Sequence, residues 1–552
     1  MDKKINLEQN LLALSKNNPD LSSRISGVEI RQNNYIFQES RSTDIVPSWL
    51  TPGSSLPLHS MVDPHREAKR LMDSIKEEGF IILLGLGGGY YAEAALEHKK
   101  IGLVLALDFN ISSIKELFCS KDYTKILSDN RFHLIIDAAE YEIENFILRF
   151  YQPLLYGGIQ TLPLRARIQG DNDVFTKTRL TIEASIKKVS ADLSVQSYFG
   201  SRWFSNILRN LKKAEKNNNI LPSIKKAAVI AAGPSLNLQV KSLREKKNDL
   251  FIIATDTSLP CLLSNDVCPD AVVSIDCQHI SYSHFMGGLP KDTLLFIDLV
   301  SPPLIASQSK NIHFFSGNHP LTTYICKTWR PFPMVDTSGG NVTYTSVALA
   351  EILGAESIEL YGADFSYPLG LSYARGTYIY TCIEFMQKRL ASLESYHSAL
   401  LYRGPLTKIT RDTSWYYESQ SLKFYRQKLE EKCQVSDFSL IPQEGLGAPI
   451  MVSNINKGIK VYKSDYSPKA AATSAENLLL HVKNSIQSLP QPMKDFNYLQ
   501  LLTDDERIIF NTILPVAATL KRRFPLLNTN DLVERTREYC VNEIIRVLRI
   551  ID

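Results

Sequence analysis

The sequence predicts an α/β protein built from two Rossmann-like parallel-sheet domains, followed by a mainly helical C-terminal region. Two buried apolar runs, 80–84 and 227–232, each end in a glycine-containing turn and lead into a helical pattern. Further short apolar runs alternate with helical segments on both sides of these turns, as in parallel sheets with crossover helices. The chain of 552 residues also exceeds what one hydrophobic core normally serves, so several domains are expected.

The composition, 44% hydrophobic and 22% charged, is typical of a soluble globular protein. Its 62 basic and 58 acidic residues are too evenly balanced to favour nucleic acid or an acidic membrane as a partner. The eight cysteines form no C-x-x-C pair, which favours reduced thiols, and neither they nor the histidines show metal-ligand spacing. The N-terminus lacks a signal-peptide pattern, and no apolar run approaches the roughly 18–20 residues of a membrane span. We therefore expect a cytoplasmic protein.

The first half of the chain divides into three expected parts. Residues 1–60 form an N-terminal extension without a clear pattern. Residues 61–170 form the first Rossmann-like domain, with a helical pattern at 66–79, the Gly-rich loop 85–89, and strands expected at 80–84, 101–107 and 132–136. Residues 171–222 form a helical connector of one long helix or two, and its charged, Asn-rich segment 212–219 is the expected linker.

The second half divides into two parts. Residues 223–405 form the central Rossmann-like domain, with a helix at 342–352 and strands at 227–232, 250–255, 271–275, 293–297, 312–315 and 357–361. Residues 406–552 are expected to be mainly helical, with patterns at 412–432, at 470–489 and from 504 to the end.

Two turns of the central domain carry most of the chemical information. The first, 233–235, reads Gly-Pro-Ser, and the second, 337–341, reads Thr-Ser-Gly-Gly-Asn. Each opens a helix, whose start presents unpaired N–H groups and the positive end of a dipole. Two such starts facing one crevice would hold an anion, and phosphate makes a nucleotide-type ligand the leading hypothesis. The alternative is that each turn is an ordinary connection without a ligand.

Acidic residues fall at or just after the carboxyl ends of four expected strands, where ligands bind in open parallel sheets. They are Asp256, Asp276, Asp298 and Asp364. Each could bond a sugar hydroxyl, hold Mg²⁺ beside a phosphate or act as a base, or merely cap the helix that follows. Polar residues at the second turn, such as Asn341 and Thr343, either line the same crevice or cap the helix.

The Gly-rich loop 85–89 of the first domain invites a dinucleotide or S-adenosylmethionine interpretation, with Asp108 bonding a ribose. Its third glycine comes too early for the usual fingerprint. A folded but empty Rossmann-like domain is the alternative.

Several motifs together resemble a known family, the motility-associated factor glycosyltransferases linked to flagellin glycosylation. They are 232–236 (Ala-Gly-Pro-Ser-Leu), 254–256 (Ala-Thr-Asp), 268–276 (Cys-Pro-Asp-Ala-Val-Val-Ser-Ile-Asp), 338–342 (Ser-Gly-Gly-Asn-Val) and 360–366 (Leu-Tyr-Gly-Ala-Asp-Phe-Ser). The loop 84–90 also resembles the first domain of that family. The resemblance covers most of residues 80–460, and the order and spacing of the motifs carry it.

The resemblance implies a central domain similar to bacterial sialyltransferases. The implied donor is a nonulosonic, sialic-acid-like sugar activated by cytidine monophosphate (CMP), and the implied acceptor is serine or threonine of flagellin. No cofactor is firmly implied. The residues that would surround the nucleotide are Gly233, Pro234, Ser235, Asp256, Asp276, Ser338, Gly339, Gly340, Asn341 and Thr343.

Catalysis would then fall to Asp276 and Asp364, with Asp364 near the sugar, and the base that takes the acceptor proton would be Asp276, Asp364 or a nearby histidine. Relatives typically show a His-Ala pair after the G-x-D motif, whereas this chain carries Tyr373 at the position of that histidine. A phenol there could donate to a departing phosphate, and the proton-transfer role of the histidine would have to move elsewhere.

Two other functions remain open. The Gly-Pro-Ser domain also resembles archaeal pterin diphosphokinases, in which ATP and Mg²⁺ would meet the aspartates. The altered position 373 keeps open a flagellin-binding chaperone with a degenerate site.

Overall fold

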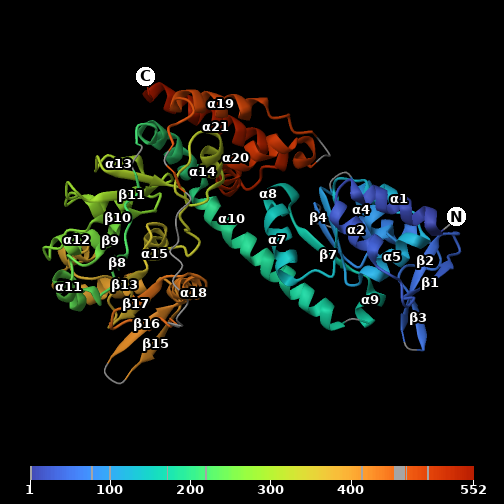
Figure 1. Cartoon of the computed structure of the whole chain (residues 1–552), viewed down its shortest axis with the longest axis horizontal. Coiled ribbons are helices and arrows are strands. Elements are labelled where there is room, and N and C mark those ends of the chain that lie inside the picture. The colour runs from blue at the N-terminus through green and yellow to red at the C-terminus, as the bar shows by residue number, and fades with distance from the viewer. Residues whose placement is uncertain are drawn as a thin grey trace. The chain divides into compact units, whose positions relative to one another are not determined.

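The structure is a computed structural model of the whole chain (Figure 1). It describes residues 3–51, 53–75, 79–98, 101–170, 172–217, 220–411, 414–452, 466–467, 469–493 and 497–551. Two compact units emerge from its contacts. Unit 1 comprises residues 1–198, 488–507 and 515–538, and unit 2 comprises residues 199–487, 508–514 and 539–552.

Unit 2 is built on a seven-stranded parallel sheet in the order β12-β11-β10-β9-β8-β13-β17 (Figure 1). The strands are β8 (Lys226–Ile230), β9 (Phe251–Thr255), β10 (Ala271–Ser274), β11 (Leu294–Asp298), β12 (Ile312–Phe315), β13 (Ser357–Tyr361) and β17 (Ser439–Pro442). The chain builds outward from β8 to β12 and then returns to place β13 on the other side of β8. The strand order therefore reverses between β8 and β13, which is where doubly wound sheets bind ligands.

Helices and a small sheet surround this framework. The helices are α11 (Leu236–Glu245), α12 (Leu259–Leu263), α13 (Pro303–Ala306), α14 (Pro320–Thr328), α15 (Val342–Ile352), α16 (Tyr378–Met386), α17 (Leu393–Leu401), α18 (Gln420–Val435), and the 3₁₀ turns η1 (Asp256–Ser258) and η2 (His279–Phe285). The small antiparallel sheet has the order β14-β16-β15, with β14 (Tyr367–Pro368), β15 (Leu406–Thr410) and β16 (Trp415–Ser419). Helix α15 is largely buried and packs on β8 and β9 through Val347, Ala348 and neighbouring residues.

Unit 1 contains a four-stranded parallel sheet in the order β6-β5-β4-β7. Its strands are β4 (Phe80–Leu84), β5 (Leu103–Asp108), β6 (Phe132–Ile136) and β7 (Ile159–Pro163). Its helices are α3 (Pro64–Asp73), α4 (Tyr90–Glu97), α5 (Ile111–Ser120), α6 (Thr124–Leu127), α7 (Glu140–Phe150), α8 (Pro153–Tyr156) and α9 (Arg165–Gly170). The strand order again reverses, here between β4 and β7, so both units have a switch point of the same kind.

The N-terminal extension is folded onto unit 1. It forms α1 (Lys3–Ser15), α2 (Pro19–Gly27) and an antiparallel sheet of β1 (Tyr35–Glu39), β2 (Ile45–Thr51) and β3 (Ser54–Pro57). The buried amide of Asn10 donates to the backbone oxygens of Phe118 and Lys121 and accepts from the N–H of Tyr123. These bonds fix α1 against the end of α5.

The remaining elements are helical. They are α10 (Asn172–Glu215), α19 (Ala475–Ser488), the 3₁₀ turn η3 (Tyr498–Leu501), α20 (Asp504–Arg523) and α21 (Thr529–Ile551). No helix among the described residues is both long and apolar enough to cross a membrane.

The expected α/β class, with two parallel sheets and a helical C-terminal region, is confirmed. The connector is one helix, α10, and residues 171 and 218–219 of that region lie outside the described residues. The helix expected from 412 begins at Gln420 instead, because 415–419 pair as strand β16; residues 412–413 lie outside the described residues. Strand β17 belongs to the central sheet, so the boundary expected at 405 separates a strand from its sheet.

Candidate functional site

A cavity of about 240 Å³ lies at the switch point of unit 2. Gly233 enters it from the loop after β8, Asp364 from the loop after β13, and Asn341 and Thr343 from the start of α15. The structure therefore brings one residue of each expected turn, Gly233 and Asn341, to the same cavity. The volume lies just below the about 300–1,000 Å³ typical of small-molecule sites.

The start of α15 supplies the hydrogen-bond donors of this cavity. Asn341 is the N-cap, and its side-chain oxygen accepts from the N–H of Tyr344 at 3.0 Å. Among the described residues, no partner takes the N–H groups of Val342 and Thr343, which line the cavity. Unpaired N–H groups at the positive end of an 11-residue helix favour an anion. The expected capping and cavity-lining roles of Asn341 therefore coexist.

The Gly-Pro-Ser turn is organised differently. The carboxylate of Asp364 accepts from the N–H of Ser235 at 2.9 Å, from the Ser235 hydroxyl and from the N–H of Gly447. A side chain at Gly233 would meet this carboxylate and would lie 2.5 Å from the carbonyl oxygen of Gly362. The carboxylate of Asp364 therefore binds the N–H of Ser235 at the start of α11, where the sequence analysis expected a phosphate to bind. Burial raises the pKa of Asp364, while its three hydrogen bonds oppose that rise.

The other strand-end carboxylates are held by local hydrogen bonds. Asp256 accepts from the hydroxyl of Ser274 at 2.7 Å and from Thr257. Asp276 accepts from the N–H of Gln278 at 2.9 Å, and burial, with the charge of Asp256, raises its pKa. Neither aspartate lines the cavity.

Asp298 is buried at the end of β11. Burial raises its pKa to about 7 against the effect of backbone N–H donors from Val300, Gly317 and Leu299. These contacts make Asp298 part of the framework of unit 2.

Among the expected nucleotide-binding residues, several do not line the cavity. Ser235 and Asp364 border a second cavity of about 250 Å³ next to the loop 442–450. The expected nucleotide-binding residues that do not line the first cavity are Pro234, Ser235, Asp256, Asp276, Ser338, Gly339 and Gly340. Gly339 is required where it stands because any side chain would overlap the ring of Tyr344. The glycines of this turn therefore allow close packing beneath the helix start.

The rest of the cavity is lined by hydroxyl-bearing residues together with apolar ones such as Phe365 and Leu422. Tyr373 lies there as expected, and burial, with the nearby charges of Tyr367 and Asp256, raises the pKa of its phenol. Tyr425 of α18 also lines the cavity. Of the described lining residues, none is lysine, arginine or histidine, and Asp364 is the one acidic residue. Among the described residues, no group of three or more His, Cys, Asp or Glu side chains is arranged to hold a metal ion.

The sequence analysis missed one histidine beside the cavity. The hydroxyl of Ser372, a lining residue, lies 3.0 Å from Nδ1 of His397, which is fully buried on α17. No motif links these two residues. The available signal is that His397 lies four residues before the buried Leu401, on the apolar side of a short helix.

Side chains from other parts of unit 1 fill the space around its Gly-rich loop, 85–89. Leu164, which follows β7, lies so close that side chains at Gly85 and Gly87 would overlap it. Fully buried His59 accepts from the N–H of Gly88 at 2.9 Å, and burial lowers its pKa to about 3. Asp108 accepts from the N–H of Leu86 at 3.0 Å. The N–H groups of Leu86 and Gly88, which would bind a pyrophosphate, and the carboxylate of Asp108, which would bind a ribose, therefore all take part in hydrogen bonds within the protein.

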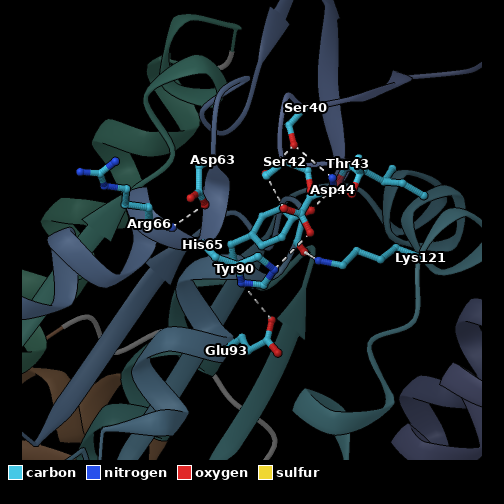
Figure 2. Close-up of polar contacts among 12 residues, drawn as sticks. Ser40, Ser42, Thr43, Asp44, Asp63, His65, Arg66, Tyr90, Glu93 and Lys121 are labelled. Carbon is cyan, nitrogen blue, oxygen red and sulfur yellow. Dashed lines mark hydrogen bonds and ion pairs between the residues drawn. The ribbon is translucent and has the colours of Figure 1, made fainter.

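A polar cluster lies beside this loop (Figure 2). The side chain of His65 lies between Asp44 of the β1–β2 connection and Glu93 of α4, at 3.4 and 3.9 Å. Lys121 lies over the ring of Tyr90 at 3.5 Å, and the phenol of Tyr90 donates to the backbone oxygen of Ile45. Together with closure of the loop, these contacts favour the folded but empty alternative for this domain.

The family model that matches this chain lies within unit 2. Residues 202–370 match the family model described as MptE-like, 6-hydroxymethylpterin diphosphokinase MptE-like. One protein of Treponema pallidum (strain Nichols), named only as uncharacterized, is 31% identical over 168 residues, which cover 29% of this chain and 79% of the relative. The chain belongs to the family of that protein. A second and a third uncharacterized T. pallidum protein are 25% and 27% identical, covering 31% and 32% of this chain and 62% and 31% of their own lengths.

One solved structure matches the whole chain. It is described as the structure of MAf glycosyltransferase from Magnetospirillum magneticum AMB-1. The alignment covers 99% of this chain and 95% of that one, with a TM-score of 0.59 and 12% sequence identity. The chain therefore has the fold of that glycosyltransferase. The expected resemblance to motility-associated factors is confirmed at the level of the fold.

Proposed function

We propose that this chain is a glycosyltransferase that moves a nonulosonic sugar from a CMP-activated donor to serine or threonine hydroxyls of flagellin in the cytoplasm. The observation that carries the proposal is the switch-point cavity of unit 2, which joins the start of α15 to the loop containing Asp364. The likeness to a MAf glycosyltransferase along the whole chain supports the same reaction class.

The chemistry of the lining suits a single phosphate. In such a donor, one phosphate joins the nucleoside to the sugar, and that phosphate leaves with the nucleoside. Its charge matches a cavity lined by the first residues of α15 and by hydroxyl-bearing residues such as Thr343, Tyr373 and Tyr425. Negative charge grows on this phosphate as the bond to the sugar breaks. Donors fixed before the reaction stabilise that charge without reorganising.

The transfer forms one bond and breaks another. The acceptor oxygen bonds to the anomeric carbon of the sugar, the bond from that carbon to the phosphate oxygen breaks, and the hydroxyl proton leaves for a base. Asp364 is the carboxylate that lines the cavity. A carboxylate has about four acceptor sites, of which Ser235 and Gly447 use three. We therefore propose that Asp364 accepts the proton of the acceptor hydroxyl and that Tyr373 donates a hydrogen bond to the departing phosphate.

A pterin diphosphokinase is the second candidate, because the family model that matches residues 202–370 carries that description. A triphosphate carries more charge than CMP and is normally bound with Mg²⁺ through one or two carboxylates. Thermal shift separates the two, since a ligand that binds the native state raises the melting temperature. We expect CMP to raise the melting temperature and ATP with Mg²⁺ to leave it unchanged; the reverse would favour the kinase.

Mass measurement tests the acceptor. Intact flagellin from a strain without this gene should lose the mass of the glycan, and the gene with Tyr373→Phe should restore less of that mass than the wild-type gene. Unchanged glycan mass would refute the transferase. Reduced flagellin secretion with unchanged glycan mass would favour the chaperone.

A further inference from the structure

His397 lies directly behind the wall of the cavity. It is fully buried on α17, and its Nδ1 is 3.0 Å from the hydroxyl of Ser372. The ring of Tyr380 packs beside it at 5.4 Å between ring centroids. Its second nitrogen, Nε2, is buried and has no hydrogen-bond partner among the described residues.

The charge state of His397 follows from these surroundings. Burial lowers the pKa of its imidazole, and the acidic residue that opposes this, Glu394, is exposed to solvent on the same helix. The ring is therefore neutral at pH 7 and carries one N–H. That N–H is on either Nδ1 or Nε2, and the hydrogen bonds of the two nitrogens decide which.

The two tautomers give Ser372 opposite roles. With the proton on Nε2, the serine donates to Nδ1, and a buried N–H is left without an acceptor, which is the more costly arrangement. With the proton on Nδ1, the ring donates to the serine oxygen, and only a lone pair on Nε2 stays unpaired. The second tautomer leaves the serine O–H free to donate to another group, and Ser372 lines the cavity.

We propose that His397 is a positioning residue that fixes Ser372 as a hydrogen-bond donor to the anionic group of the ligand in the switch-point cavity. The identity of that ligand rests on the proposed function. A hydroxyl that already accepts from an imidazole N–H is polarised and donates more strongly. Such a donor suits a cavity in which no described lining residue carries a positive charge.

The tautomer is tested first, without any ligand. The full chain is labelled with ¹⁵N-histidine, and the signals of His397 are identified by their loss in His397→Asn. We expect a protonated Nδ1 and an unprotonated Nε2. A protonated Nε2 would overturn the proposal, whatever the ligand is.

Binding of CMP then tests the role of the pair. An asparagine amide can place its N–H where Nδ1–H stands, whereas leucine cannot donate at all. We expect His397→Asn to bind CMP within about threefold of wild type, while His397→Leu and Ser372→Ala each weaken binding about tenfold, a typical effect of one hydrogen bond. In the Ser372→Ala background, His397→Leu should weaken binding no further. If His397→Leu weakens CMP binding further in the Ser372→Ala background, the histidine does not act through the serine and the proposal is wrong.

A second histidine–hydroxyl pair provides the matched control. Nε2 of His481 lies 3.1 Å from the phenol oxygen of Tyr324, and neither residue lines the cavity. His481→Leu should bind CMP as wild type does. If wild type itself does not bind CMP, the proposed donor is wrong, while the tautomer still decides whether His397 directs Ser372.

Discussion

The structure makes Asp364 a clamp as well as a cavity residue, and Asp364→Asn tests this directly. The carboxylate is 5% exposed and accepts three hydrogen bonds, from the N–H and hydroxyl of Ser235 and from the N–H of Gly447. The clamp joins the start of α11 to the loops after β13 and β17. An asparagine keeps one acceptor oxygen and places an amide N–H₂ against a donor.

The expected loss can be worked from these contacts. Hydrogen bonds to charged groups contribute about 1.5–3 kcal/mol each, and a buried donor left unpaired costs about 1–3 kcal/mol. Burial raises the pKa of Asp364, so a neutral side chain also relieves part of a desolvation cost. We therefore expect Asp364→Asn to lower the free energy of unfolding of unit 2 by about 2–3 kcal/mol.

Guanidinium unfolding followed by tryptophan fluorescence is a suitable assay, because Trp203, Trp329 and Trp415 all lie in unit 2. Asp276→Asn is the matched control. Asp276 accepts from Gln278 within its own turn, so its loss should cost less than about 1 kcal/mol. A change for Asp364→Asn that is no larger than the control would refute the clamp.

Three further predictions concern other positions. Gly233→Ala places a methyl group against the carboxylate of Asp364 and should abolish the CMP thermal shift, whereas Gly287→Ala, which meets nothing within 4 Å, should retain it. The pKa of Asp298 rises from 3.8 to about 7 on folding, so the native state binds the extra proton. The stability of wild type relative to Asp298→Asn, read from denaturation curves, should therefore fall by on the order of 3 kcal/mol between pH 4 and pH 7, and a flat difference would contradict this. Burial lowers the pKa of His59 from 6.5 to about 3. As the pH drops below about 6.5, the unfolded chain therefore binds a proton at His59 that the native state does not bind, and stability should fall. His59→Gln keeps an acceptor for the Gly-rich loop and should weaken that acid sensitivity; an unchanged pH profile would count against the closed loop.

Elements with a strong local signal were predictable from the sequence. Helix α15 (Val342–Ile352) has the expected bounds because an Asn N-cap precedes it. Strand β13 (Ser357–Tyr361) also has the expected bounds, because a short apolar run forms it. Strand β17 was not predictable. It is a four-residue Ser-Leu-Ile-Pro segment at the sheet edge with one buried residue, so neither its length nor its pattern separates it from a loop.

The candidate site was predictable as a place rather than as a set of contacts. Alternating strands and helices predict parallel strands whose carboxyl ends share one sheet edge, so Gly233 and Asp364, which follow β8 and β13, could be expected there. The hydrogen bonds between Asp364 and Ser235 join residues 129 positions apart, and no local pattern encodes them. The same holds for the pair of Ser372 and His397.

The two switch points show why glycine content alone does not identify a ligand loop. The loop of unit 1 contains more glycine than the Gly-Pro-Ser turn of unit 2, yet Leu164 and His59 fill the space beside it. Its glycines are needed because other side chains approach the backbone closely. At the start of α15, the ring of Tyr344 packs against Gly339, and the first helical residues, Val342 and Thr343, line a cavity. A glycine-rich strand-to-helix turn therefore indicates close approach to the backbone, and the surrounding side chains decide whether one of them or a ligand makes that approach.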